Sequence, residues 1–134
     1  MILTSETVIK VRYSETDQMG VVHHGNYAQY LEVARIEWLA QLGISYKSME
    51  ENGIILPVYA LDFKFNKSAF FDDQLIVKTS LRKIPSVKII FDFEIFNSDK
   101  ELLTIASATL VFVDGKTRKP IKCPSYLLDK IQSD

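Results

Sequence analysis

The hydrophobic residues follow a helical period in one segment of the chain and an alternating period in several others. Apolar side chains recur every three to four positions over residues 27–42, which predicts one long helix. Asn26, with Gln29 three residues later, matches an N-terminal capping box, and Gly43 stands where a glycine commonly ends a helix. The apolar positions cover more than one face, so we expect other elements to surround this helix.

Alternation of apolar and polar residues predicts strands before and after the helix. The first strand is expected at 7–13, and the others at 61–66, 75–82, 87–95 and 102–113. The last run is apolar or small at nearly every position, as in a strand covered on both faces. Short helical segments are expected at 45–52, before Gly53, and at 125–132. The pattern predicts an α+β fold in one domain, residues 1–134, with a five-stranded antiparallel sheet wrapped around one long central helix.

Such an open sheet leaves two edge strands with unpaired backbone groups. Pairing two edges across a symmetric dimer covers them economically, so we expect a homo-oligomer, either a homodimer or a homotetramer.

Composition narrows the class of partner. The chain has 134 residues, 47% hydrophobic and 25% charged, with a net charge of -1 and a pI of about 6.1. This balance gives no global electrostatic case for binding nucleic acid or an anionic membrane. Any polyanionic ligand therefore has to be met by a local cluster of lysine and arginine.

Location and redox state are read from what the sequence contains. Cys123 is the single cysteine, which excludes an intramolecular disulfide and favours a reducing compartment. No histidine or aspartate is close to it in sequence, so a catalytic thiol is not expected. The N-terminus does not resemble a signal peptide, and no stretch has the apolar length of a membrane span. We expect a cytoplasmic protein.

Candidate chemistry is concentrated just before the long helix, in residues 13–27. Asp17, His23 and His24 lie there beside a helix N-terminus, whose free N–H groups can polarise a carbonyl oxygen. A carboxylate at such a place can act as a general base on water or as a nucleophile on an acyl group. The combination is typical of an acyl-transfer site.

Structural explanations exist for the same residues. Asp17, shortly before Gly20, is also a common turn residue. The adjacent His23 and His24 face opposite ways in an extended segment, so only one of them is expected to line a site, and no metal site is expected. The aromatic residues of the helix, Tyr27 among them, are also expected in a hydrophobic core.

The residues from Asp17 to Arg35, in the pattern D-x-x-G-x-V-x-H-G-x-Y-x-x-Y-x-x-x-A-R, resemble a known family. It is the 4-hydroxybenzoyl-CoA thioesterase-like branch of the hotdog superfamily, with the greatest similarity to the acyl-CoA thioesterases associated with the Tol-Pal gene cluster. Residues 69–73 and 113–124 are similar to its later turns. Ser68 departs from the pattern, because many relatives carry proline there.

The resemblance implies a hotdog fold and roles for several residues. Asp17 falls on the catalytic aspartate, and His24 on the position that orients the thioester and stabilises the oxyanion, partly through its backbone N–H. Tyr13 falls on a tyrosine that supports the aspartate, and His23 on a packing position. Gly25 and Tyr27 are expected to contact substrate at the helix start, with Tyr30 and Arg35 near or behind them.

A CoA thioester also brings phosphates, which bind lysine, arginine and free N–H groups. By similarity to the family, Lys83 and Ser86 are the leading candidates for the nucleotide end of CoA. The alternative is that their connection is an ordinary solvated hairpin.

The sequence therefore predicts an acyl-CoA thioester hydrolase that needs no cofactor, since CoA is part of the substrate. The alternatives are a thioesterase for acyl carrier protein esters, a hotdog dehydratase with a differently placed acid and base, and a non-catalytic CoA-binding module.

Overall fold

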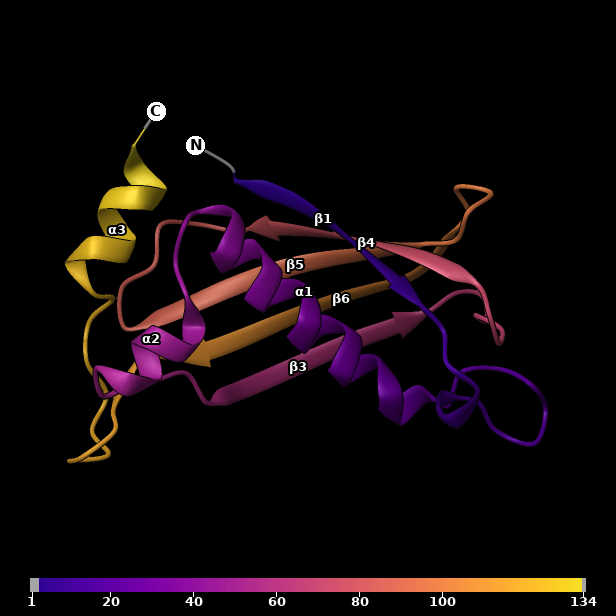
Figure 1. The fold of residues 1–134 in the computed structure, drawn as a ribbon, viewed down its shortest axis with the longest axis horizontal. Helices are drawn as coiled ribbons and strands as arrows, with labels where there is room; N and C mark the ends of the chain where they lie inside the picture. The colour runs from indigo at the N-terminus through magenta and orange to yellow at the C-terminus, as the bar shows by residue number, and fades with distance from the viewer. Residues whose placement is uncertain (1–2, 134) are drawn as a thin grey trace.

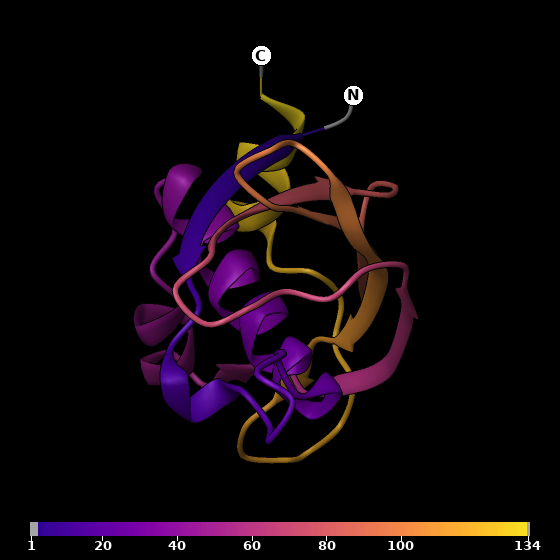
Figure 2. The same ribbon diagram turned by 90° about the vertical axis from the view of Figure 1, so that its right-hand side faces the viewer.

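A five-stranded antiparallel sheet and the long helix α1 (Tyr27–Gln41) make up most of the structure, a computed structural model that describes residues 3–133. The strands are β1 (Thr4–Lys10), β3 (Val58–Phe65), β4 (Gln74–Leu81), β5 (Lys88–Phe96) and β6 (Leu102–Val111). Their order across the sheet is β1-β4-β5-β6-β3. α1 crosses one face of the sheet, which curves around it (Figures 1 and 2). The predicted hotdog architecture is confirmed.

The core lies between α1 and the concave face of the sheet. Leu31, Ala34 and Trp38 of the helix are buried and face alternate residues of the strands. The Trp38 ring meets Phe91 of β5 edge to face, with 5.0 Å between ring centroids. One side of α1 and one face of each central strand thus account for the two periodicities of the sequence.

The C-terminal end of α1 agrees with the prediction, and its N-terminal end does not. Gly43 ends the helix as expected, with φ of +82° and an N–H that donates to the Ala40 carbonyl at 2.9 Å. The predicted capping box at Asn26 and Gln29 is wrong. Asn26 has helical backbone angles and belongs to a preceding 3-10 turn, η2 (His24–Asn26), and its side-chain amide donates to the Glu15 carbonyl at 2.8 Å.

Several element boundaries also differ. β1 ends at Lys10, so the predicted strand end at Tyr13 is wrong, and a 3-10 turn, η1 (Tyr13–Glu15), stands there instead. After β6, a short strand β7 (Val113–Asp114) pairs with β2 (Ile54–Ile55), a sheet that the pattern did not predict. The two expected short helices are α2 (Tyr46–Glu51) and α3 (Ser125–Gln132).

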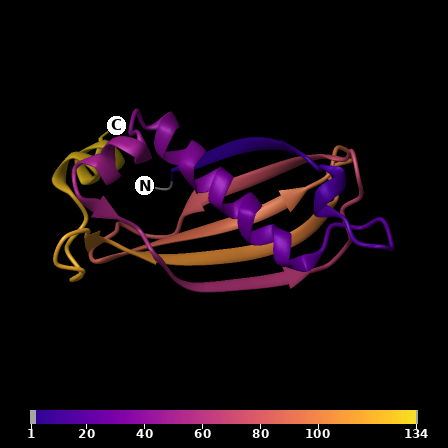
Figure 3. The same ribbon diagram turned by 60° about the horizontal axis from the view of Figure 1, so that its bottom comes forward.

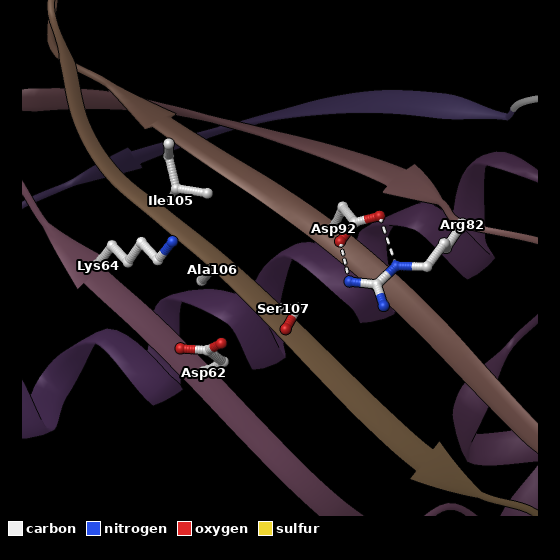
Figure 4. Close-up of a pocket in the computed structure, with 7 residues that line it drawn as sticks. All are labelled: Asp62, Lys64, Arg82, Asp92, Ile105, Ala106 and Ser107. Carbon is white, nitrogen blue, oxygen red and sulfur yellow. Dashed lines mark hydrogen bonds and ion pairs between the residues drawn. The ribbon is translucent and has the colours of Figure 1, made fainter.

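Some apolar surface stays uncovered in the single chain. Val33 of α1 is 51% exposed and Ile105 of β6 is 41% exposed, so neither the helix nor β6 is enclosed as predicted. The convex face of the sheet also carries polar residues. Figure 4 shows Arg82 and Asp92 there, which form a two-fold hydrogen-bonded ion pair at 3.1 and 2.6 Å. No helix in residues 3–133 is long and apolar enough to cross a membrane.

Truncation of a buried helix residue tests this packing. Leu31 is 2% exposed between α1 and the sheet, so Leu31→Ala should lower the free energy of unfolding by about 2–5 kcal/mol through lost burial and a residual cavity. Glu37→Ala, at an exposed position of the same helix, should change it by less than about 0.5 kcal/mol. Urea denaturation of the two variants measures the difference, and equal midpoints would contradict the assigned helix face.

Candidate functional site

Asp17 lies in the loop that leads from β1 to α1. Figure 3 shows this loop at the end of the molecule where the helix begins. Its Oδ1 accepts the Met19 N–H at 2.8 Å and, more weakly, the Val21 N–H at 3.4 Å. Gly20, with φ of +82°, closes the same turn by donating to the Asp17 carbonyl at 3.0 Å. Asp17 is therefore a turn residue, as the structural explanation required. Within residues 3–133 nothing donates to its Oδ2, which leaves that oxygen available.

Asp17 borders an open depression of about 300 Å³ beside the start of α1. The depression brings Asp17, His24 and Tyr27 together, three of the residues predicted from the sequence. Its lining residues are Asp17, Val21, Val22, His24, Tyr27, Phe65, Asn66, Lys67 and Ser68. The last four belong to the end of β3 and the turn after it, so the sheet supplies the opposite wall. Burial raises the pKa of Tyr27, which keeps its hydroxyl protonated at neutral pH.

The two histidines do not point in opposite directions. Their rings lie against each other with 4.3 Å between centroids, because the chain leaves the extended conformation and enters the 3-10 turn at His24. Only His24 borders the depression. His23 is exposed, so it is not buried in a packing role as the resemblance implied.

The turn at the start of α1 carries two free backbone donors. Within residues 3–133, the N–H groups of His24 and Gly25 donate no hydrogen bond, whereas the neighbouring His23 and Asn26 N–H groups are bonded to carbonyls at 2.9 Å. Gly25 also fits closely here, because a Cβ at this position would lie 3.3 Å from the His23 ring. The turn therefore presents N–H groups of the kind that stabilise a developing oxyanion.

Glu15 is a buried carboxylate in the same loop, and the sequence pattern did not predict a role for it. It is 5% exposed, and its oxygens accept the Arg12 N–H at 2.8 Å and the Tyr30 hydroxyl at 2.8 Å. The Arg12 guanidinium pairs with it at 3.0 Å. The one signal in the sequence is the spacing of three residues between Arg12 and Glu15, which permits an ion pair but does not reveal the burial.

Tyr13 lies outside the depression. Its side chain is 76% exposed and packs edge to face on Phe71, with 5.5 Å between ring centroids. Its backbone carbonyl accepts the Thr16 N–H at 3.1 Å and the Thr16 hydroxyl at 2.7 Å, which turns the chain toward Asp17. Any support that Tyr13 gives to Asp17 within this chain passes through the backbone.

Lys83 and Ser86 lie at the opposite end of the same chain. β4 begins beside the Asp17 loop and ends just before Lys83, and its eight residues at about 3.3 Å each separate the two regions by about 25 Å. Backbone hydrogen bonds join their connection to the chain near Cys123, whose N–H donates to the Ser86 carbonyl at 2.7 Å. One chain therefore does not bring all the predicted site residues together.

Cys123 is unsuited to nucleophilic chemistry. Burial raises the pKa of its thiol to about 11, so the thiol stays protonated at neutral pH. Its place is also at the end of the molecule away from Asp17.

Comparison with known proteins identifies the family of the chain. Residues 11–131 match the model of the thioesterase-like superfamily. The putative acyl-CoA thioesterase YneP of Bacillus subtilis is 34% identical, over 88% of this chain and 86% of its own length. The chloroplastic acyl-acyl carrier protein thioesterase ATL3 of Arabidopsis thaliana is 32% identical, over 93% of this chain and 66% of its own.

A solved structure of a thioesterase is also similar to this chain. The DHNA-CoA thioesterase of Staphylococcus aureus superposes with a TM-score of 0.90 at 40% identity, over 97% of this chain and 91% of that one. The association with the Tol-Pal gene cluster stays a prediction. The fold and the length of the match show that the chain belongs to the thioesterase-like superfamily and is a hotdog-fold thioester hydrolase.

Proposed function

We propose that this protein hydrolyses acyl-CoA thioesters to a carboxylic acid and free CoA, with the Asp17 carboxylate as the reacting group. The observation that carries the proposal is that one depression is bordered by Asp17 and by the turn with the free His24 and Gly25 N–H groups. An acyl transfer needs both a nucleophile or base and a donor for the oxyanion. Thioesterase relatives with similarity along nearly the whole chain support the reaction class.

The chemistry at Asp17 has two possible routes. As a general base, Asp17 removes a proton from water, the water oxygen attacks the thioester carbonyl, and the C–S bond breaks to release the CoA thiolate, which then takes up a proton. As a nucleophile, Oδ2 attacks the carbonyl, and the C–S bond breaks to release the CoA thiolate, which takes up a proton. Water then splits the resulting acyl anhydride into the product acid and free Asp17. In single turnover with labelled water, label entering the Asp17 carboxylate, or a trapped acyl-enzyme, supports the nucleophilic route. Label only in the product acid, with no acyl-enzyme trapped, supports the general-base route.

His24 and Gly25 serve the oxyanion in this proposal. Hydrogen bonds from preorganised N–H groups strengthen as the carbonyl oxygen gains negative charge, so they lower the barrier more than they favour substrate binding. The His24 side chain, which borders the same depression, orients the thioester. Tyr27 and Phe65, whose rings lie 5.1 Å apart, form an apolar wall for the acyl group.

A second copy of the chain completes the site in this proposal. Every residue of the edge strand β3 except Phe63 is exposed, and the exposed residues include Leu61 at 42% and Phe65 at 48%. A long apolar edge of this kind is normally paired or covered. Antiparallel pairing of two β3 strands places the Asp17 end of each chain beside the Lys83 end of the other. Three strands of the second copy, β3, β6 and β5, then lie between these two ends. At about 4.8 Å per strand, the pantetheine arm of CoA can cross this span.

Lys83 and Ser86 of the second copy then bind the nucleotide end of CoA. The neighbouring Arg82 is paired with Asp92, which leaves Lys83 as the free cation of this connection. Within residues 3–133, Lys83 forms no ion pair, and both candidates are exposed.

The end of the molecule that carries Lys83 also supports a second candidate function, the hydrolysis of acyl carrier protein esters. It carries six exposed cations that form no ion pair within residues 3–133: Lys83, Lys88, Lys116, Arg118, Lys119 and Lys122. This cluster suits an acidic carrier domain, and the relative ATL3 is an acyl-acyl carrier protein thioesterase. A kcat/KM that is much higher for a carrier-bound acyl group than for the same acyl-CoA would favour this candidate.

Replacement of Asp17 tests the reaction. Asp17→Asn keeps the Oδ1 acceptor of the turn but removes the base and nucleophile, so kcat on a panel of short, long and aromatic acyl-CoAs should fall by at least about 100-fold. Asp129→Asn, an exposed aspartate of α3, is the matched control and should keep wild-type kcat. Equal activity of Asp17→Asn and wild type would overturn the site, and a wild type inactive on every CoA and carrier ester would favour a binding module.

A charge on the β3 edge tests the need for a second copy. Leu61→Glu should give monomers in sedimentation analysis and a large loss of kcat/KM, because a charge at a paired strand edge opposes association. Val8→Glu, on the opposite edge strand β1 where Val8 is 60% exposed, should stay dimeric and active. A fully active Leu61→Glu monomer would contradict the shared site.

Loss of one cation tests the nucleotide contact. An exposed ion pair contributes about 0.2–1 kcal/mol, so Lys83→Ala should raise KM for acyl-CoA by up to about fivefold at low salt, with kcat unchanged and less effect at high salt. The same variant should show no change on an acyl-pantetheine that lacks the nucleotide. Lys47→Ala, at an exposed position of α2, is the control. An equal effect on both substrates would exclude the assigned phosphate contact.

A further inference from the structure

Glu15 uses all of its carboxylate within the protein. Oε1 accepts the Arg12 N–H and the Tyr30 hydroxyl, each at 2.8 Å, and Oε2 accepts Arg12 Nε at 3.1 Å beside the 3.0 Å ion pair to Nη2. The residue is 5% exposed and does not border the depression. It therefore has no oxygen free to meet substrate, and any contribution to the reaction has to pass through the groups that it holds.

The backbone of Glu15 holds the start of the helix. Its carbonyl oxygen accepts the His23 N–H at 2.9 Å and the Asn26 side-chain amide at 2.8 Å. These two residues flank His24 and Gly25, whose N–H groups are free. One residue thus fixes the turn that presents the oxyanion donors, both from its carbonyl and through Tyr30 on the first turn of α1.

Glu15 is equally close to Asp17 along the chain. Only Thr16 stands between them, and its backbone pairs with Val22 while the Asp17 N–H donates to the Val21 carbonyl at 2.9 Å. A shift of Glu15 therefore moves the Asp17 turn and the helix start relative to one another.

We propose that Glu15, held by Arg12 and Tyr30, is a positioning residue that sets the separation between the Asp17 carboxylate and the His24 and Gly25 N–H groups. The inference rests on the proposed function of Asp17. A misplacement of about 1 Å at a reacting group can lower the rate by about 100-fold, whereas the proposed CoA contacts lie at the other end of a second chain and do not depend on Glu15.

The ionisation of Glu15 agrees with this role. Burial alone would raise its pKa, but hydrogen bonds from Arg12 and Tyr30 and the Arg12 charge together lower the pKa below the ordinary value of 4.5. The group is therefore charged at neutral pH. Its contribution to stability is present above the ordinary glutamate pKa and is lost as pH falls through the lowered folded pKa.

Two substitutions distinguish a positioning role of Glu15 from a general contribution to the stability of the fold. Glu15→Gln keeps the size of the side chain but faces the Arg12 guanidinium with an amide, and Tyr30→Phe removes one hydroxyl. We expect kcat for acyl-CoA to fall about tenfold to 100-fold in Glu15→Gln and less in Tyr30→Phe, with KM within about threefold in both. Circular dichroism at the assay temperature confirms that the compared proteins are folded. Tyr46→Phe is the matched control, because its hydroxyl accepts the Leu56 N–H at the other end of α1, and it should keep wild-type kcat.

Combining Glu15→Gln with Asp17→Asn tests whether Glu15 acts through Asp17, because a merely structural role of Glu15 would lower both rates by the same factor. Glu15→Gln should lower the residual rate of Asp17→Asn by a smaller factor than it lowers the wild-type rate, since the carboxylate that it positions is absent. If Glu15→Gln and Tyr30→Phe are folded and keep wild-type kcat, or only raise KM, the inference about Glu15 is overturned. The proposed function still stands in that case if Asp17→Asn is inactive. A fully active Asp17→Asn would instead remove the proposed function itself. If Glu15→Gln does not fold, Tyr30→Phe decides.

Discussion

The structure depends on the burial of one side of α1 against a curved antiparallel sheet. Trp38 and Leu31 fill the concave face, and the free energy of that packing fixes the helix axis relative to the strands. Because the axis is fixed, the first turn of α1 and the exit of β1 always meet at the same end of the sheet. The depression at Asp17 is a result of that meeting, and its opposite wall is the end of β3.

The loop that carries Asp17 is ordered by a different kind of force. Few of its side chains are buried, and its shape comes from backbone hydrogen bonds, the left-handed Gly20 and the buried Glu15. Buried charges are costly unless they are fully paired, and Glu15 meets that condition with Arg12 and Tyr30. The core supplies a rigid platform, and this small polar network places the reacting groups upon it.

The sequence predicted the fold well because the two hydrophobic periods are long and clear. The positions of α1, β4 and β5 follow directly from them, and Gly43 marks the end of the helix. Asp17 and His24 were found through a spaced pattern rather than through periodicity. The site geometry was less accessible, because it depends on where side chains go in three dimensions. The Asn26 amide donates to the Glu15 carbonyl instead of capping the helix. Neither that contact nor the burial of Glu15 could be predicted from the sequence.

The length of β4 has a consequence for dimers that combine two different variant chains. It holds Asp17 and Lys83 at opposite ends of one chain, so in the proposed dimer each site takes its carboxylate from one chain and its nucleotide contact from the other. A chain defective at either end spoils one site of a mixed dimer and leaves the second intact. Two such chains, each defective at a different end, together rebuild one complete site, which is the pattern that geneticists call intragenic complementation.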